Sequence, residues 1–184
     1  LLDPRVNKAA AIVSRLGLSL DCWLYHPQLD EVAQLADAHP ELTIILNHIG
    51  SPILGGPYRG KTGEVFQEWK AAIIRVSERA NVYVKLGALP IRMPSYYGDR
   101  SSPPGSEEVA AAWRPWMETC IEAFGPERSM YESNFPVQKR WCSYQVCWNA
   151  FKRISMGASP SEKRALFAGA AARAYRIKSD LLLD

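Results

Sequence analysis

The sequence predicts an α/β fold in which parallel strands alternate with covering helices. Short apolar runs typical of strands are separated along the 184 residues by longer stretches with helical periodicity. This repetition of βα units indicates a parallel sheet, because parallel neighbours need a crossover connection. A flavodoxin-like open sheet and part of a (β/α)8 barrel both fit this order of elements.

Four apolar runs, each bounded by Gly, Pro, Asn or His, are the predicted strands. They cover residues 18–25, 42–47, 81–86 and 128–133. Two long loops, residues 50–62 and 87–105, follow the second and third of these strands. Long connections of this kind are usually functional, and both architectures place their ligands at the carboxyl ends of the strands.

Helical patterns fill the intervals between the strands. Apolar stripes at helical spacing cover residues 27–39, 63–80, 106–124 and 144–156. A last helix begins at Ser-Pro-Ser-Glu, residues 159–162, which is a capping box with proline at the first helical position. Pro115 falls inside the third helix, which we expect it to kink or divide.

The composition is that of an ordinary globular protein. Lys and Arg number 22 and Asp and Glu 19, so the net charge is +3, with 47% of residues hydrophobic and 22% charged. This balance argues against a nucleic-acid-binding polycation, and no apolar run approaches the roughly 20 residues of a membrane helix. The start of the chain has no signal-peptide core. We therefore expect one domain over residues 1–184, cytoplasmic, with neither nucleic acid nor membrane as partner.

Polar side chains at the ends of the predicted strands are the candidate catalytic residues. His48 follows the second strand, where an imidazole suits a metal ligand, a general base or a carbonyl polariser. Lys85 closes the third strand and is either an anion-binding cation or a solvated or paired lysine. Asn134 follows the fourth strand on the same face as Glu132. Asp21, inside the first strand, needs a partner, so an internal salt bridge and a catalytic role both remain open.

Four further residues are candidates for binding a substrate. Tyr25 and His26 end the first strand, and Tyr58 and Arg59 lie in the first long loop. The basic and aromatic residues of the two long loops, Arg59, Lys61 and Arg92 with Tyr58, Tyr96 and Tyr97, suit a small anionic molecule better than a nucleic acid at a net charge of +3, and solvated loop charge fits them better still. The glycines of the loop match neither common phosphate-binding pattern.

Five short segments, met in order along the chain, point to a known family. They are PQL at 27–29, NHIG at 47–50, VKLG at 84–87, FGPER at 124–128 leading to SNFPV at 133–137, and ALF at 165–167 leading to ARAYR at 172–176. Together they resemble the amidohydrolase-related family, in its branch of metal-dependent hydrolases and sugar or aromatic lactonases. The resemblance covers nearly the whole chain and implies a (β/α)8 barrel of the TIM type, with active-site groups at the carboxyl ends of the strands.

The same resemblance assigns residues and a cofactor. His48 matches the family's histidine after the sixth strand, and Asn134 falls where many members carry an aspartate that binds metal or activates water. Asparagine at position 134 lacks the negative charge of that aspartate. Gln138 also stands where the family usually has Asp. A divalent metal, most plausibly zinc, is implied. His48 is a metal ligand only with ligands from upstream of this chain, since the family's His-x-His pair does not occur in it.

Four predicted strands are half of the eight in a barrel, and a typical barrel has about 250 residues. The chain is therefore expected to hold the last four βα units of a domain truncated at its N-terminal side. An isolated half barrel exposes strand edges and a core face. We expect it to form homo-oligomers, to aggregate, or to be a truncated gene product.

The resemblance implies a hydrolase, specifically a lactonase that opens a small cyclic ester. In that reaction His48 orients or activates water or polarises the carbonyl, Asn134 binds water or substrate, and Lys85 holds a carboxylate or the developing oxyanion. The alternative is a non-catalytic truncated barrel that binds a ligand or a partner. A decarboxylase is a third alternative, and it requires the same absent metal ligands.

Overall fold

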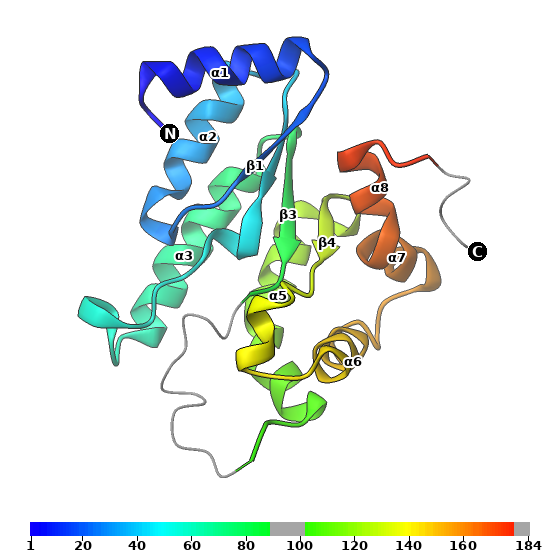
Figure 1. Ribbon diagram of the computed structural model, residues 1–184. Helices are drawn as coiled ribbons and strands as arrows, with labels where there is room; N and C mark the ends of the chain where they lie inside the picture. Colours follow the sequence, from blue (N-terminus) through cyan, green and yellow to red (C-terminus); the bar gives the residue numbers. More distant parts are fainter. Residues whose placement is uncertain (89–101, 179–184) are drawn as a thin grey trace.

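The computed structural model describes residues 1–88 and 102–178, which form a four-stranded parallel sheet covered by helices (Figure 1). The strands lie side by side in chain order: β1 (Ser19–Cys22), β2 (Thr43–Leu46), β3 (Val82–Leu86) and β4 (Ser129–Tyr131). All three neighbouring pairs are parallel. The α/β class with a parallel sheet is thus confirmed, whereas the assignment to the last four units of a barrel stays a prediction.

Helices follow the strands in the predicted alternation. They are α2 (Leu29–Ala38), α3 (Thr62–Ser77), α5 (Ser106–Phe124), α6 (Tyr144–Ile154), α7 (Pro160–Arg164) and α8 (Ala170–Tyr175), with a π-helical turn, η7 (Ala165–Gly169), before α8. The predicted capping box is present, because Ser159 and Glu162 each accept a hydrogen bond from the other's backbone N–H. Across the described ranges, every helix is too short or too polar to cross a membrane.

Several boundaries differ from the prediction. β1 is shorter than the predicted strand over residues 18–25. Its last residue, Cys22, pairs with Leu46, where β2 ends, so the chain beyond Cys22 has no neighbouring strand to pair with. The predicted helix over 27–39 starts as a separate 3-10 turn, η1 (His26–Gln28). A helix that the sequence analysis did not predict, α1 (Pro4–Arg15), begins after Asp3, which accepts a hydrogen bond from a backbone N–H of its first turn.

Pro115 does not divide α5, which runs unbroken through it. Its ring is exposed, so the carbonyl that loses its partner in the helix can bond to water instead. On the buried side of α5, Trp116 packs on Trp69 of α3 with ring centroids 4.8 Å apart, and Trp113 packs on Phe151 of α6 at 5.6 Å. Packing on both neighbouring helices holds α5 together across the proline.

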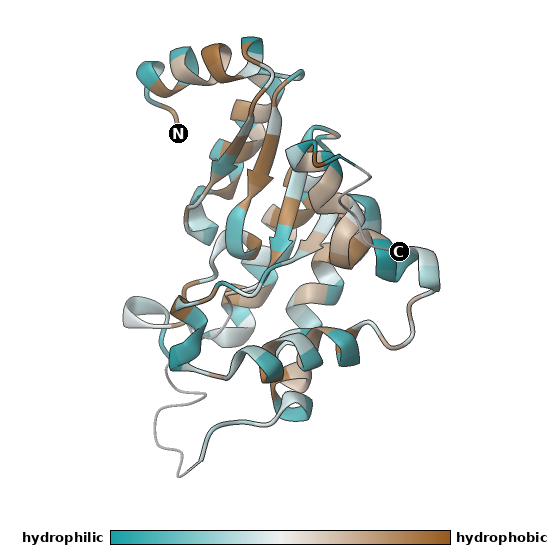
Figure 2. Cartoon of the chain, turned by 45° about the vertical axis from the view of Figure 1, so that its right-hand side comes forward, coloured by the Kyte–Doolittle hydropathy of each residue, from teal (hydrophilic) through white to brown (hydrophobic). Residues whose placement is uncertain are grey.

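The two faces of the sheet are covered differently. The main core lies between the sheet and α2, α3 and α5, and its strand residues include Ile44, Leu46, Val82, Val84 and Leu86. Brown stretches of these strands lie near the centre of Figure 2, and in β3 they alternate with pale and teal ones. On the opposite face, Ile45 and Met130 pack against Ala170 and Ala174 of α8. The C-terminal helix therefore covers part of the face that a half barrel was expected to expose.

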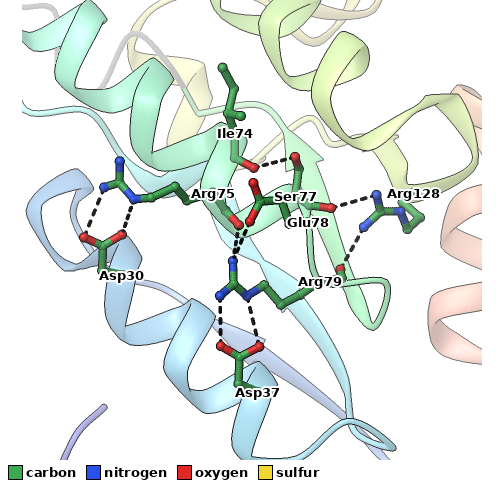
Figure 3. A network of polar contacts seen from close by, with 8 residues as sticks. All are labelled: Asp30, Asp37, Ile74, Arg75, Ser77, Glu78, Arg79 and Arg128. Atoms are coloured by element: carbon green, nitrogen blue, oxygen red, sulfur yellow. Dashed lines mark hydrogen bonds and ion pairs between the residues drawn. The ribbon is translucent and has the colours of Figure 1, made fainter.

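A polar network joins α2, α3 and the sheet before the start of β3 (Figure 3). The half-buried Arg128 donates to the carbonyl oxygens of Ser77, Arg79 and Val82 at 2.9–3.1 Å. Carbonyls at the end of a helix have no partner within it, so Arg128 supplies donors that α3 itself lacks. Two ion pairs beside it link α2 to α3, Asp30 to Arg75 and Asp37 to Arg79. This network lies at the amino end of β3 and serves stability.

Candidate active site

His48 and Glu132 meet at the carboxyl end of the sheet. His48 lies in the 3-10 segment η2 (Asn47–Gly50) after β2, and Glu132 directly follows β4. Their side chains are only 20% and 16% exposed, and His48 Nδ1 is bonded to the Glu132 carboxylate. An ionised carboxylate only accepts hydrogen bonds, so with Glu132 in that form the geometry places the proton on Nδ1, and in the neutral imidazole the free lone pair is then on Nε2. The pair can therefore take a proton at Nε2.

An unusual backbone turn carries His48 away from the line of β2. His48 and Ile49 both have positive φ angles, 58° and 49°, and Gly50 follows at 72°. A Cβ atom at Gly50 would lie 2.5 Å from a methyl carbon of Leu29, so this position has no room for a side chain. The N–H of Ser51 donates to the carbonyl oxygen of His48 at 2.8 Å and closes the turn.

β3 separates β2 from β4, and Gly87 at its end leaves the space in which His48 and Glu132 meet. A Cβ atom at Gly87 would lie 2.4 Å from the carbonyl oxygen of Glu132 and 2.5 Å from its Cγ atom. The N–H of Glu132 donates to the carbonyl oxygen of Leu86 at 3.2 Å, which keeps the two backbones close. Only glycine at position 87 permits this approach.

Lys85 is held by Asp21, on the face of the sheet that α8 covers. Its Nζ lies 2.6 Å from Asp21 Oδ1, and the hydroxyl of Tyr175 donates to the same oxygen at 2.9 Å. Burial opposes the charge on Lys85, but hydrogen bonds to Asp21 and Tyr175 outweigh it and raise the pKa of the ammonium group. Asp21 thus forms an internal salt bridge, which was one of the two roles that the sequence left open for it. An anion-binding role for Lys85 stays a prediction.

His26 contacts Tyr58, which belongs to the first long loop. His26 Nδ1 accepts a hydrogen bond from the N–H of Ile53 at 3.2 Å, and the ring of Tyr58 stands edge-on to it with centroids 5.1 Å apart. Burial lowers the pKa of His26, although the carboxylate of Glu68, 4.0 Å from Nε2, opposes that shift. Arg59 is exposed at the end of this loop. Their predicted contacts with substrate stay predictions.

We expect the burial of His26 to make the fold acid-sensitive. The unfolded chain takes up a proton at this residue near pH 6.5, whereas the folded chain takes it up only at lower pH. The free energy of unfolding should therefore fall as the pH drops below about 6.5. Urea titrations of the wild type and His26→Gln between pH 7.5 and 5 measure this: the stability advantage of the wild type should shrink as the pH falls. An advantage that does not change with pH would contradict the expectation.

Buried amide groups lie on the segments that follow two of the strands. Asn134 has a positive φ of 52° three residues beyond β4. Its Nδ2 atom and the Oδ1 atom of Asn47 are buried and have no hydrogen-bond partner among the described residues. Gln138 is fully buried, and its Nε2 and Oε1 atoms also have no hydrogen-bond partner among the described residues. Because buried polar atoms normally have partners, Asn47 and Asn134 are candidates to bind water or a substrate.

A cavity of about 790 Å3 lies along the chain that continues from Asn134. Its lining includes Phe135, Cys142 and Tyr144, together with Pro103 and Pro104. His48 and Glu132 are not among its described lining residues. The two candidate reacting groups therefore lie at the carboxyl end of the sheet, outside the described lining of this cavity.

Glu132 is the residue of this site that sequence reasoning missed as a partner of His48. Side chains alternate between the two faces of a strand, so Glu132 was placed on the same face as Asn134. An acidic group at the end of a buried strand also needs a partner. Its partner is 84 residues away along the chain, so no local pattern could identify it. Trp23 was also left unassigned, although its indole packs edge-on near His48 with ring centroids 6.3 Å apart.

The described residues do not assemble a zinc site. Within residues 1–88 and 102–178, no three His, Cys, Asp or Glu side chains converge as metal ligands. A zinc site takes at least three protein ligands, and Nδ1 of His48 is already bonded to Glu132. A role of His48 as a ligand therefore still depends on ligands from outside these residues.

Parallel βα units with polar side chains collected at the carboxyl ends of the strands are the arrangement in which proteins of the α/β class commonly place their ligand sites. A sequence model of the amidohydrolase family matches residues 1–177. The chain belongs to the amidohydrolase family.

Two known proteins show how the sequence of this chain relates to others. An uncharacterised protein of Sinorhizobium fredii, y4mH, is 38% identical over 165 residues, which are 90% of this chain and 49% of that protein. The L-fucono-1,5-lactonase of Burkholderia multivorans is 28% identical over 158 residues, covering 85% of this chain and 51% of the lactonase. The chain spans about half the length of the curated relatives it matches.

A solved structure shares the fold. The crystal structure of an amidohydrolase from Burkholderia multivorans with bound zinc superposes with a TM-score of 0.80 at 24% identity. The match covers 94% of this chain and 57% of that one. The zinc belongs to that protein, and the likeness establishes the fold of this one.

Proposed function

We propose that this chain is the carboxyl-terminal part of a lactonase, comprising the last four βα units of a (β/α)8 barrel domain that opens the ring ester of a small polyhydroxylated molecule. The observation that carries the proposal is the bond between His48 and Glu132 at the carboxyl end of the sheet. Membership of the amidohydrolase family supports hydrolysis. The name of the 28% identical relative, an L-fucono-1,5-lactonase, supports a sugar lactone as substrate.

The chemistry follows from the tautomer of His48. Nε2 removes a proton from water, and the resulting hydroxide attacks the lactone carbonyl. Glu132, bonded to the Nδ1 proton, orients the ring and stabilises the imidazolium that forms. The unpaired Nδ2 group of Asn134 supplies a donor for the carbonyl oxygen as it becomes negative. When the tetrahedral intermediate collapses, the C–O bond of the ring breaks and the leaving oxygen takes the proton from Nε2.

A second candidate function is ligand binding without catalysis. One observation favours it: residues 1–88 and 102–178 bring together no three metal-ligating side chains, although a related fold carries zinc. In that case the histidine and the amides bind a ligand without transforming it.

A panel of lactones separates the two functions. The purified chain is mixed with L-fucono-1,5-lactone, its 1,4-isomer and a series of other aldonolactones, and acid release is followed with a pH indicator against the spontaneous rate. Ring opening of at least one lactone above that rate supports the lactonase. A chain that is folded by circular dichroism, binds the sugar acid and leaves every lactone unchanged supports ligand binding.

A further inference from the structure

An aromatic side chain stands open to solvent beside the catalytic histidine. Trp23 follows β1 and is 61% exposed, although indole is among the most costly groups to leave in water. Its ring lies 6.3 Å from the ring of His48, at a steep interplanar angle of 72°, and 6.2 Å from that of Tyr25. Exposed apolar surface next to reactive groups is a usual feature of ligand-binding sites.

Ser51 fixes the indole in this place. The Nε1–H group of Trp23 donates to Ser51 Oγ at 3.1 Å, and Ser51 is itself 96% buried, with a relative exposure of 4%. The same residue donates its backbone N–H to the carbonyl oxygen of His48 at 2.8 Å and accepts from the N–H of His26 at 3.4 Å. One buried serine thus ties the turn of His48 to the indole, so the two rings keep a fixed relation.

We propose that Trp23 is the platform on which the ring of a bound sugar lactone lies. The inference rests on the proposed function and deepens it, since it names the feature that is recognised. The face of an indole is electron-rich and flat, so it attracts the apolar C–H face of a compact ring and not an extended chain. The substrate class is therefore a five- or six-membered sugar lactone bound by its ring face, and the open-chain acid produced by the reaction binds more weakly.

Binding measurements without turnover test the platform directly. The probe is L-fucono-1,5-lactam, in which a ring N–H replaces the ring oxygen and resists hydrolysis, and the open-chain fuconate is its comparison. We expect Trp23→Ala to weaken lactam binding about tenfold, on the scale of an aromatic stacking contact, and Trp23→Phe by about threefold or less. The loss of lactam affinity in Ser51→Ala should lie between those of Trp23→Phe and Trp23→Ala, because this change removes the hydrogen bond that holds the indole but keeps the indole itself.

Leu18 provides the matched control. It is 53% exposed and lies just before β1, at the opposite end of the same strand, so Leu18→Ala removes a comparable apolar side chain away from His48. Lactam affinity of Leu18→Ala should equal that of the wild type. Equal affinity of wild type and Trp23→Ala for the lactam, or no binding of the lactam by the folded wild type, would overturn the platform.

Kinetics of the same variants separate this inference from the proposed function. Trp23→Ala should raise KM for the lactone more than it lowers kcat, because the platform binds the ring in both ground and transition states. If hydrolysis requires His48 but has the same KM and kcat in Trp23→Ala as in the wild type, the platform is wrong and the proposed lactonase function is still supported. Trp23-dependent binding of the lactam without hydrolysis of any lactone supports the platform and overturns the lactonase.

Discussion

Replacement of His48 by Ala is expected to lower lactone turnover at least about a hundredfold, the loss typical of a general base. We expect the variant to keep the fold, because the side chain lies on a turn after β2, and circular dichroism checks this. Initial rates under saturating lactone measure the effect. His39→Ala is the matched control: this histidine ends α2 and bonds to Asn7, and its loss should leave turnover unchanged.

Glu132→Gln extends this test to the orientation of the imidazole. A glutamine can donate from its amide nitrogen to Nδ1, which then holds the lone pair and leaves Nε2 protonated. Turnover should fall about tenfold to a hundredfold, as is usual when the partner that orients a functional histidine is lost. Full turnover in a folded His48→Ala or Glu132→Gln variant would mean that this pair does not carry the reaction.

Gly87→Ala is expected to damage both the stability of the fold and the site. The added methyl group would lie 2.4 Å from the backbone oxygen of Glu132, and backbone cannot move aside as a flexible side chain can. Overpacking of this kind costs about 1–3 kcal/mol of unfolding free energy. Because Glu132 must move to relieve this clash, its hydrogen bond to His48 should be lost, and lactone turnover should fall as a result. Urea unfolding and the lactone assay on the same preparation measure the two effects.

Gly63→Ala is the control for this substitution. A Cβ atom at Gly63 meets no atom within 4 Å, and the residue lies in the first turn of α3, where alanine is the better helix former. We expect unchanged turnover and a gain in stability of up to about 1 kcal/mol. If Gly87→Ala behaved like Gly63→Ala, the close approach of β3 to Glu132 would not be needed for the fold or the site.

Local signals in the sequence were sufficient for the elements of this fold. The bounds of α5, residues 106–124, were predicted without error, because Ser-Glu-Glu begins the helix and a glycine ends it. The capping box of α7 and all four strands were also found. Each of these depends on residues within one or two turns of each other. The exception is α1, which was not predicted and which buries only Ala10.

The sequence by itself determined the βα order and the family, and it made His48 a candidate, because these inferences depend on neighbouring residues and recurring segments. Only the tertiary structure decided which polar groups meet. Lys85 pairs with Asp21 across 64 residues, and His48 with Glu132 across 84. Such contacts are set by the order of strands in the sheet, by the left-handed turn at His48 and by the missing side chain at Gly87. None of these has a periodic signature, so the partners became known only when the chain was folded.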